Sequence, residues 1–494
     1  MNVQTKLLCT FLWLSASVPF AFAKQAPKLT FEKYSLSVTN TVTGKLLYVN
    51  DTEHDTDLLI QSDKGFVYYP QIVKNTLSTD GTLINIPKDA RYYNIGRRAN
   101  VEQDVLFYLT KDEIQSYDFT TQQLTSLFSI DSLSRYQQEF EAKLSPFILD
   151  VNGDELTDVI TYSLDNTHLY LQQENGGFIH KVLPLSPKVT SSSQSVTFTP
   201  YPFFHIDING DNRKDISFQV YGKLVSFLQQ NNGSFNSEAH HTALNAGILS
   251  RLEYKKLKQD SKSEVAQVSI EGIEDLNNDG IVDLITKSRL KTGMISSDNE
   301  LLIRYGSLNN GFLAFREKPD GKAVFEGEGD LVFKDINQDG LKDYYTRGVE
   351  IGFGMIMSAM SGSVDVDLNF YLMNDTGNYH KKPAFQSEME VEISDDSDGF
   401  GLNAIEDFNG DGALDLIIQS DDDEFKIHHG GGKNVFAKRG TSYDITLPIK
   451  GHSEVKDFNG DGKADLLLLH GKKYDSEEKK ELGKNQIVLW LSAG

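Results

Sequence analysis

Aspartate and asparagine recur at one fixed spacing in six short segments of the chain, which have Asp at positions 1, 5 and 9 and Asn at position 3. In a tight loop, the side chains of positions 1, 3 and 5 converge on one point and the carbonyl of position 7 joins them. The carboxylate of position 9 then completes the shell of six to eight oxygens that Ca²⁺ prefers. The candidate metal ligands are Asp150, Asn152, Asp154, Asp158, Asp207, Asn209, Asp211, Asp215, Asp275, Asn277, Asp279, Asp283, Asp335, Asn337, Asp339, Asp343, Asp407, Asn409, Asp411, Asp415, Asp457, Asn459, Asp461 and Asp465. We therefore expect up to six structural calcium ions.

Position 6 of each segment has to turn sharply, which favours glycine. Four segments meet this demand with Gly280, Gly340, Gly412 and Gly462. Asn212 is acceptable because asparagine tolerates a left-handed backbone, whereas Glu155 is poorly suited to one. We therefore predict that the loop beginning at Asp150 is the weakest of the six.

Two other kinds of loop share part of this pattern. Asp-rich turns also form without a metal, because Asp and Asn side chains bond their own backbone. That does not explain three carboxylates at one spacing six times, since their repulsion is costly unless a cation neutralises it. An EF-hand needs Glu at position 12 and a helix on either side. Position 12 is never acidic here, so the EF-hand is rejected.

The elements that position these loops are predicted to be strands. Apolar runs such as Leu416–Ile418 and Leu466–Leu469 follow the ninth residue, and short runs of this kind are typical of strands buried on both faces. A second strand, an Asn/Gly turn and an aromatic residue come next, and we expect the aromatic to lead the outer strand of the unit at Phe178, Phe235 and Phe312. One unit is thus an antiparallel sheet of about four strands, and such sheets can bury both faces by packing around an axis.

These loops and strands resemble the FG-GAP/VCBS repeats of integrin-α-like propellers, and the resemblance extends from Asp150 to the C-terminus. It implies an all-β fold, a radial β-propeller with calcium in loops between strands. Such repeats are often found in bacterial surface or secreted proteins, so the resemblance also implies a protein of this kind.

The number of blades follows from the spacing of the repeats. The ninth-position aspartates lie 50 to 72 residues apart. Two degenerate copies precede them, one with Asp51, Glu53 and Asp57 and one with Asp104, each followed by an apolar run. We therefore predict about eight four-stranded blades, with seven as the alternative. Residues 24–145 form the degenerate blades and residues 146–494 the blades with intact loops.

The two ends of the chain are expected to share one blade. The last unit stops at Ile487–Leu491 and lacks an outer strand, which Leu29–Phe31 and Tyr34–Leu36 could supply. Pairing the ends in this way would remove an exposed sheet edge.

Residues 1–23 read as a cleavable signal peptide. Lys6 is followed by an apolar region from Leu7 to Val18, and Ala21-Phe22-Ala23 forms a small-residue cleavage site. The chain's single cysteine, Cys9, lies inside this segment, so the mature protein would have no thiol for a disulfide or a thiolate metal site. No other segment is long and uncharged enough to span a bilayer. We expect a secreted or periplasmic protein.

The charge balance restricts the partners. The chain has 48 basic and 71 acidic residues and a formal net charge of -23, which argues against nucleic acid and anionic membranes. The six loops hold 18 of the acidic residues, so calcium would account for much of this charge.

Three functional hypotheses remain open. The first is a binding or adhesion module with a protein or glycan partner, because the sequence has no nucleotide-binding glycine loop, zinc helix or nucleophile elbow. The pairs His240-His241 and His428-His429 would point to opposite faces of a strand, so neither is expected to form a shared metal site. The second is a polysaccharide lyase or hydrolase with its active site on the propeller face.

The third hypothesis is an assembly component that docks through the Gly/Met-rich insertion Gly348–Gly362. We expect Ile351–Ile356 within it to form a buried strand, with a flexible surface loop as the alternative. The acidic runs Asp395–Asp398 and Asp421–Glu424 are interpreted as solvated loops.

Overall fold

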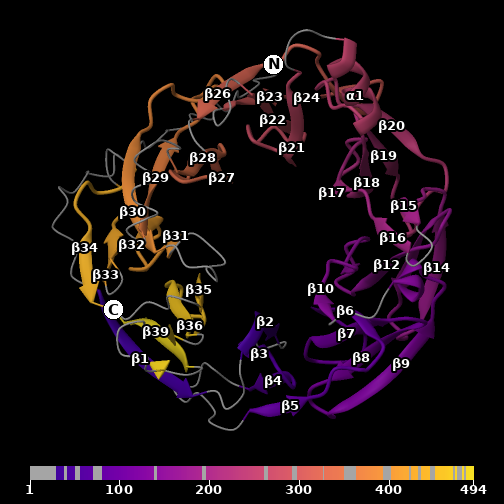
Figure 1. The fold of residues 1–494 in the computed structure, drawn as a ribbon, viewed down its shortest axis with the longest axis horizontal. Coiled ribbons are helices and arrows are strands. Elements are labelled where there is room, and N and C mark those ends of the chain that lie inside the picture. Colours follow the sequence, from indigo (N-terminus) through magenta and orange to yellow (C-terminus); the bar gives the residue numbers. More distant parts are fainter. Residues whose placement is uncertain are drawn as a thin grey trace, which may run out of the picture.

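The computed structural model describes residues 29–37, 42–50, 56–70, 81–137, 142–191, 196–260, 265–291, 297–325, 328–349, 363–392, 402–421, 424–431, 435–444, 451–470, 473–474, 481–482 and 486–493. The predicted signal peptide lies outside these ranges, as do Ile351–Ile356, Asp395–Asp398 and residues 422–423. Nearly all described elements are strands, and they form eight main sheets around a ring (Figure 1). The eight-bladed β-propeller is confirmed, and the seven-bladed alternative is wrong.

The first four blades follow one another along the chain, with their strands ordered from the inside of the ring outwards (Figure 1). Blade 1 contains β2 (Val42–Asn50), β3 (Thr56–Ser62), β4 (Gly65–Tyr69) and β5 (Thr82–Ile84), and blade 2 contains β6 (Ala90–Gly96), β7 (Val105–Thr110), β8 (Glu113–Asp118) and β9 (Gln123–Ser129). Blade 3 contains β11 (Ile148–Leu149), β12 (Asp158–Tyr162), β13 (Thr167–Gln172) and β14 (Phe178–Leu183), and blade 4 contains β17 (Phe203–Ile206), β18 (Asp215–Val220), β19 (Lys223–Phe227) and β20 (His240–Ala243).

The other four blades complete the ring. Blade 5 contains β21 (Gln267–Glu274), β22 (Asp283–Lys291), β23 (Ser297–Arg304) and β26 (Gly321–Phe325), and blade 6 contains β27 (Glu328–Lys334), β28 (Asp343–Val349), β29 (Ser363–Tyr371) and β30 (Phe385–Glu392). Blade 7 contains β31 (Asn403–Glu406), β32 (Asp415–Asp421), β33 (Glu424–His428) and β34 (Thr441–Asp444), and blade 8 contains β35 (Gly451–Lys456), β36 (Asp465–His470), β39 (Gln486–Ala493) and β1 (Thr30–Ser37).

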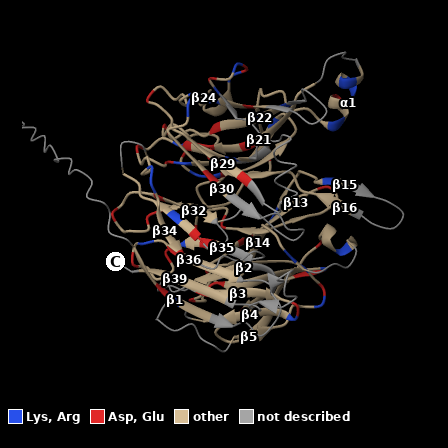
Figure 2. Cartoon of the chain, turned by 60° about the vertical axis from the view of Figure 1, so that its left-hand side comes forward, with Lys and Arg blue, Asp and Glu red and all other residues tan. Residues whose placement is uncertain are grey.

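A few elements lie outside this plan. The short strand β10 (Lys143–Leu144) pairs in parallel with β6, and three small hairpins are formed by β15 (Lys188–Ser191) with β16 (Val196–Thr199), β24 (Gly306–Asn309) with β25 (Phe312–Phe315), and β37 (Lys473–Tyr474) with β38 (Glu481–Leu482). The described helices are η1 (Leu133–Tyr136) and α1 (Arg251–Asp260). The β15–β16 hairpin and α1 project on the same side of the ring (Figure 2).

The apolar runs after the ninth aspartates become the second strand of each blade, as predicted, and they are buried on both faces. In β36, Leu466 and Leu468 pack towards blade 7 in one cluster with Ile417. Leu467 faces the other way and packs in a cluster with Leu58 of blade 1. Since side chains alternate along a strand, one apolar run fills two interfaces, and the hydrophobic core therefore lies between the blades.

Blade 8 closes the ring with both ends of the described chain. Strand β1 pairs antiparallel with β39 from Thr30↔Ala493 to Ser37↔Gln486. Phe31 of β1 makes edge contacts with the rings of Trp490 and, in blade 7, Tyr443. The predicted sharing of one sheet by the two ends is confirmed, and β1 is its outer strand.

The prediction for the aromatic that leads the outer strand is right in blade 3 but wrong in blades 4 and 5. Phe178 begins β14, whereas Phe235 makes only an isolated bridge with Gln229 and Phe312 lies in the β24–β25 hairpin. The outer strands begin later in the chain, at His240 and Gly321. Phe235 is buried between blades 3 and 4, so there the aromatic fills the interface instead of pairing with the third strand.

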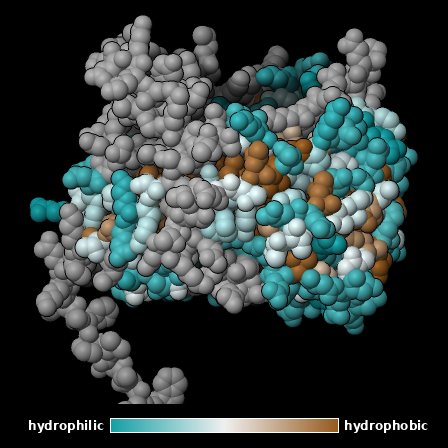
Figure 3. All heavy atoms as spheres, turned by 90° about the horizontal axis from the view of Figure 1, so that it is seen from below, coloured by the Kyte–Doolittle hydropathy of each residue, from teal (hydrophilic) through white to brown (hydrophobic). Residues whose placement is uncertain are grey.

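The outer side of the ring that Figure 3 shows is largely hydrophilic, with apolar side chains exposed in a few places. Within the described ranges, no helix has the length and apolar character needed to cross a membrane.

Candidate metal centres

Each of the six Asp-rich loops joins the first strand of a blade to the second, in blades 3 to 8. The ninth-position aspartate is always the first residue of the second strand; these residues are Asp158, Asp215, Asp283, Asp343, Asp415 and Asp465. Because strands flank every loop, the rejection of the EF-hand is confirmed.

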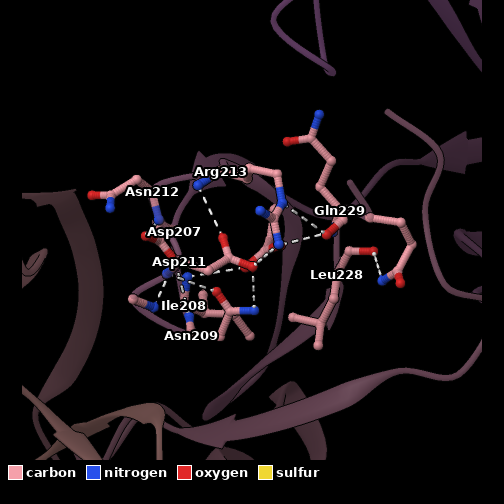
Figure 4. Close-up of polar contacts among 11 residues, drawn as sticks. Asp207, Ile208, Asn209, Asp211, Asn212, Arg213, Leu228 and Gln229 are labelled. Carbon is pink, nitrogen blue, oxygen red and sulfur yellow. Dashed lines mark hydrogen bonds and ion pairs between the residues drawn. The ribbon is translucent and has the colours of Figure 1, made fainter. Parts of the chain in front are cut away.

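The loop of blade 4 shows how such a segment folds on its own side chains (Figure 4). The carboxylate of Asp207 accepts hydrogen bonds from the backbone N–H groups of positions 4, 5 and 6, at 2.8, 3.3 and 2.7 Å. Asn209 accepts from the N–H of Asp211 at 3.2 Å, and its side-chain amide donates to the Asp211 carboxylate at 2.9 Å. Positions 1, 3 and 5 are thus linked to one loop backbone.

Three backbone hydrogen bonds to loop side chains occur in all six loops. The N–H of position 6 donates to the first aspartate at 2.7–2.9 Å. The N–H of position 5 donates to the asparagine of position 3 at 2.8–3.2 Å. The N–H of position 7 donates to the fifth-position aspartate at 2.8–3.0 Å. The six loops therefore share one conformation.

Two positions of each loop have a left-handed backbone, whereas the sequence predicted this for position 6 alone. Position 6 has a positive φ in every loop, from 64° at Asn212 to 90° at Gly340, and Glu155 adopts 66°. Position 4 is also left-handed in every loop, from 58° at Asn278 to 79° at Gly153. The sequence signal for position 4 was present, since four of its six residues are glycine and one is asparagine.

The ninth-position aspartate ties the loop to the sheet. In every loop, its Oδ2 accepts from the N–H of position 2 at 2.9–3.2 Å. Its Oδ1 accepts from an N–H at or just beyond the end of the third strand at 2.7–2.9 Å. All six side chains are fully buried. The sequence interpretation missed this second role, which fixes two strands and a loop to one carboxylate.

Burial disfavours the charged form of these aspartates, and the loop carboxylates add to the effect. The pKa of Asp158 is raised to about 8 and that of Asp283 to about 7, in each case chiefly by burial and further by the first- and fifth-position aspartates. Burial likewise raises the pKa values of Asp215, Asp343 and Asp465 to about 6, with a further contribution from loop aspartates in each case. A bound cation would stabilise the charged form of these carboxylates.

In two blades, a basic side chain contacts an aspartate of the Asp-rich loop. Arg213, at position 7 of the blade-4 loop, is paired with the carboxylate of Asp211 (Figure 4). In blade 7, Nδ1 of His429 lies 3.2 Å from Oδ1 of Asp415, and this contact raises the pKa of His429. His428 instead contacts the carbonyl of Ala437, so the two adjacent histidines have separate partners.

The two degenerate blades keep an acidic residue at the start of the second strand. Asp57 lies at the second residue of β3, and Asp104 immediately precedes β7. Asp104 accepts from the N–H of Asn50 in blade 1 at 3.1 Å. Asp57 accepts from the hydroxyl of Tyr68, so the bonds of these two carboxylates differ from those of the ninth-position aspartates.

The loops offer the donor set that a hard cation needs, with carboxylate, amide and carbonyl oxygens and no nitrogen or sulfur ligand. In the described part of the chain, no group of three or more His, Cys, Asp or Glu side chains is gathered as a metal cluster. The first, third and fifth side chains accept one to four backbone N–H groups, and an oxygen that accepts one such bond has a further lone pair. The residues therefore fit Ca²⁺, which would draw them together.

Neighbouring loops are joined by hydrogen bonds across the blade interfaces. The side-chain amide of Gln229 in blade 4 donates to the carbonyl of Asn152 at 2.6 Å. The N–H of Lys342 donates to the carbonyl of Leu276 at 2.8 Å, and that of Ala464 to Asp407 at 2.7 Å. The candidate metal centres of blades 3 and 4, of blades 5 and 6, and of blades 7 and 8 are therefore connected in pairs.

A pocket of about 330 Å³ lies at the base of α1, and its lining includes Arg251 and Tyr254. It has no histidine among its lining residues.

Comparison with known proteins supports the predicted resemblance. Residues 407–468, from the loop of blade 7 through that of blade 8, match the family model of the FG-GAP-like repeat. No curated protein sequence matches the chain.

Several solved structures are similar to this chain. A lectin of Agrocybe aegerita, solved for its recognition of non-reducing terminal N-acetylglucosamine, is 12% identical over 71% of this chain and 80% of its own, with a TM-score of 0.40. The V. cholerae biofilm matrix protein Bap1 is 12% identical over 94% of this chain and 91% of its own, with a TM-score of 0.28. A protein from Lactobacillus plantarum is 10% identical over 85% of this chain and 97% of its own, with a TM-score of 0.31.

Proposed function

We propose that this eight-bladed propeller, which contains an FG-GAP-like repeat, is an exported calcium-binding module that attaches to a glycan or protein partner. The observation that carries the calcium part is the sixfold repetition of one loop conformation. In five of the six loops, the buried ninth-position carboxylate has a raised pKa beside two further loop aspartates. Carboxylates arranged in this way are stabilised by a divalent cation.

Calcium would act as a structural ion. Each loop joins the first two strands of its blade, and hydrogen bonds such as that from Lys342 to Leu276 connect neighbouring loops. An ion in each loop would hold these strand ends at one spacing.

The attachment role is supported by the side of the ring opposite these loops. The β15–β16 hairpin and α1 connect blade 3 to blade 4 and blade 4 to blade 5, and both project from the ring (Figure 2). Long segments that project from a rigid scaffold commonly carry binding residues. The pocket at the base of α1 contains Arg251 and Tyr254, which could contact a glycan or protein partner.

The test combines calcium uptake, binding and turnover on the full mature chain. Calorimetric titration is expected to show uptake of several Ca²⁺ ions, and a glycan array is expected to retain the protein without release of sugar products. Both signals should fall in excess chelator. No calcium uptake would contradict the metal assignment, and sugar release would favour the enzyme.

A further inference from the structure

Three segments meet on the projecting side of blade 4. They are the β15–β16 hairpin with the residues that follow it, the turn between β18 and β19, and the segment that leads into α1. The carbonyl of Gly222 in the turn accepts from the N–H of Leu244 at 3.0 Å. A Cβ atom at Gly222 would lie 3.1 Å from the carbonyl oxygen of Ile248, between two residues that line the pocket. The turn and the pocket are therefore adjacent.

Two tyrosines on this surface form a rigid pair. Their ring centroids are 6.4 Å apart at an interplanar angle of 78°. Tyr201 lies between Pro200 and Pro202, so its backbone has little freedom. Tyr221 occupies the β18–β19 turn with a φ of 54°, a left-handed conformation that is costly for a bulky residue. A tyrosine kept in a position suited to glycine, and 42% exposed, indicates a role for its side chain.

The positive charge of Lys188 next to the tyrosine pair favours a negatively charged ligand over a positively charged one. The Nζ atom of Lys188 lies 5.1 Å from the ring centroid of Tyr201 and 5.2 Å from that of Tyr221. It therefore occupies the place that a cationic ligand would take over the rings. An anion, in contrast, would be attracted to this exposed ammonium group.

Further positive charge lies on the two segments next to the tyrosine pair. Lys223 follows the turn, and Arg251, Lys255 and Lys256 lie on α1, which Figure 2 shows with blue residues on its surface. Among the described residues, none of these four side chains is paired with a carboxylate. Unpaired cations gathered on a chain with a net charge of -23 indicate an anionic ligand.

We propose that this surface, defined by Lys188, Tyr201, Tyr221, Lys223, Arg251 and Tyr254, binds an acidic oligosaccharide that contains uronic acid sugars. The inference rests on the proposed attachment function and names its ligand class. A sugar ring would lay its C–H face on the exposed ring of Tyr221 and direct its carboxylate to Lys188. The next acidic sugar would reach the Arg251 pocket. Rigid tyrosines give large contact area at low entropic cost, which suits a shallow site.

The test measures binding of a hyaluronan decasaccharide to the full chain in 1 mM calcium, with maltodecaose as the neutral control. We expect the wild type to bind only the acidic sugar, more weakly as salt is raised. Tyr221→Asn should weaken this binding about fivefold to tenfold, because it removes the stacking ring. Its melting temperature should stay equal or rise, since asparagine accepts a left-handed backbone. Lys188→Ala should weaken binding and reduce the salt dependence.

The matched control is Leu308→Asn, which alters an apolar residue that is 44% exposed on β24, beside Gly210 of the blade-4 Asp-rich loop on the other side of the ring. It should bind as the wild type does. Binding of hyaluronan by Tyr221→Asn and Lys188→Ala at wild-type strength would place the acidic sugar elsewhere and overturn the inference. So would binding to phosphatidylglycerol vesicles without binding to hyaluronan. If the wild type binds neutral glycans alone, the inference fails while the attachment function stands; if no glycan or protein is retained, both fail.

Discussion

The side-chain amide of Gln229 donates to the backbone carbonyl of Asn152 at 2.6 Å, so the third strand of blade 4 is tied to the Asp-rich loop of blade 3. The N–H of the same Gln229 donates to Oδ1 of Asp215 in its own blade at 2.8 Å. One residue thus connects two candidate metal centres.

Gln229→Ala is expected to weaken this connection. The carbonyl of Asn152 loses its partner, and we expect the free energy of unfolding to fall by about 1–3 kcal/mol. Gln230→Ala is the control, because its amide donates only to the nearby carbonyl of Leu228, at 3.4 Å. Thermal unfolding of both variants checks the difference. Equal melting temperatures for the two variants would show that the connection contributes nothing.

Removal of calcium is expected to lower stability strongly. With dissociation constants of ~10⁻⁴ to 10⁻³ M, calcium at about 1 mM would stabilise each loop by roughly 0.4 to 1.4 kcal/mol. Six loops then contribute about 2 to 8 kcal/mol, which is comparable to the whole stability of a domain. The melting temperature should fall markedly in excess chelator and recover when calcium is added back. Unchanged melting in chelator would rule out structural calcium.

Two aspartates of one loop should respond differently to substitution. Asp465 accepts two backbone N–H groups in the core, so Asp465→Asn should cost about 1–3 kcal/mol even in chelator. Asp461 lies on the exposed loop, so Asp461→Asn should lose stability only when calcium is present. Unfolding measured with and without calcium separates these effects. Equal losses for both variants in chelator would contradict the division of roles.

Glu155→Gly is expected to stabilise the blade-3 loop. Glu155 has a φ of 66°, which costs an ordinary residue more than it costs glycine. After allowance for the flexibility of glycine in the unfolded chain, the gain should be about 0.5–1 kcal/mol. The control Glu238→Gly changes an exposed residue without a positive φ and should be neutral or destabilising. Chemical denaturation measures both, and no difference would remove the argument that this loop is the weakest.

Arg213→Ala should change the dependence on calcium. The guanidinium group of Arg213 pairs with Asp211 and would compete with a bound ion. In chelator the variant should lose less than about 1 kcal/mol, because the pair is partly exposed. Its loss should shrink or reverse as calcium is added. Lys463→Ala, at the same position of the blade-8 loop, is the control, and an equal calcium response of the two variants would argue against competition.

Much of the fold could be predicted because its signals repeat. The Asp-rich loops, the apolar second strands and the unpaired sheet edge at Ile487–Leu491 are local patterns, and each led to the right element. The outer strands of blades 4 and 5 were misplaced because an aromatic after a turn can equally lead a strand or fill a blade interface. Phe235 and Phe312 do not begin outer strands, and only tertiary packing decides between these fates.

The connections between loops could not be predicted from the sequence. Nothing near Gln229 indicates that its side chain reaches Asn152, 77 positions earlier in the chain. The pairing of Tyr201 with Tyr221 likewise depends on how the β15–β16 hairpin and the β18–β19 turn lie together. The two backbone hydrogen bonds to each ninth-position aspartate could not be predicted either, because they depend on how the loop and the third strand lie against the second strand.

The register of β1 with β39 also determines how the ring would respond to force. Thr30 faces Ala493, so the outermost residues of the two strands lie at the same end of the ladder. Pulling these two ends apart would break the hydrogen bonds one after another, as in a zipper, instead of loading all of them together. The ring would therefore open from Thr30 and Ala493, the outer end of this seam, when it is pulled by both ends.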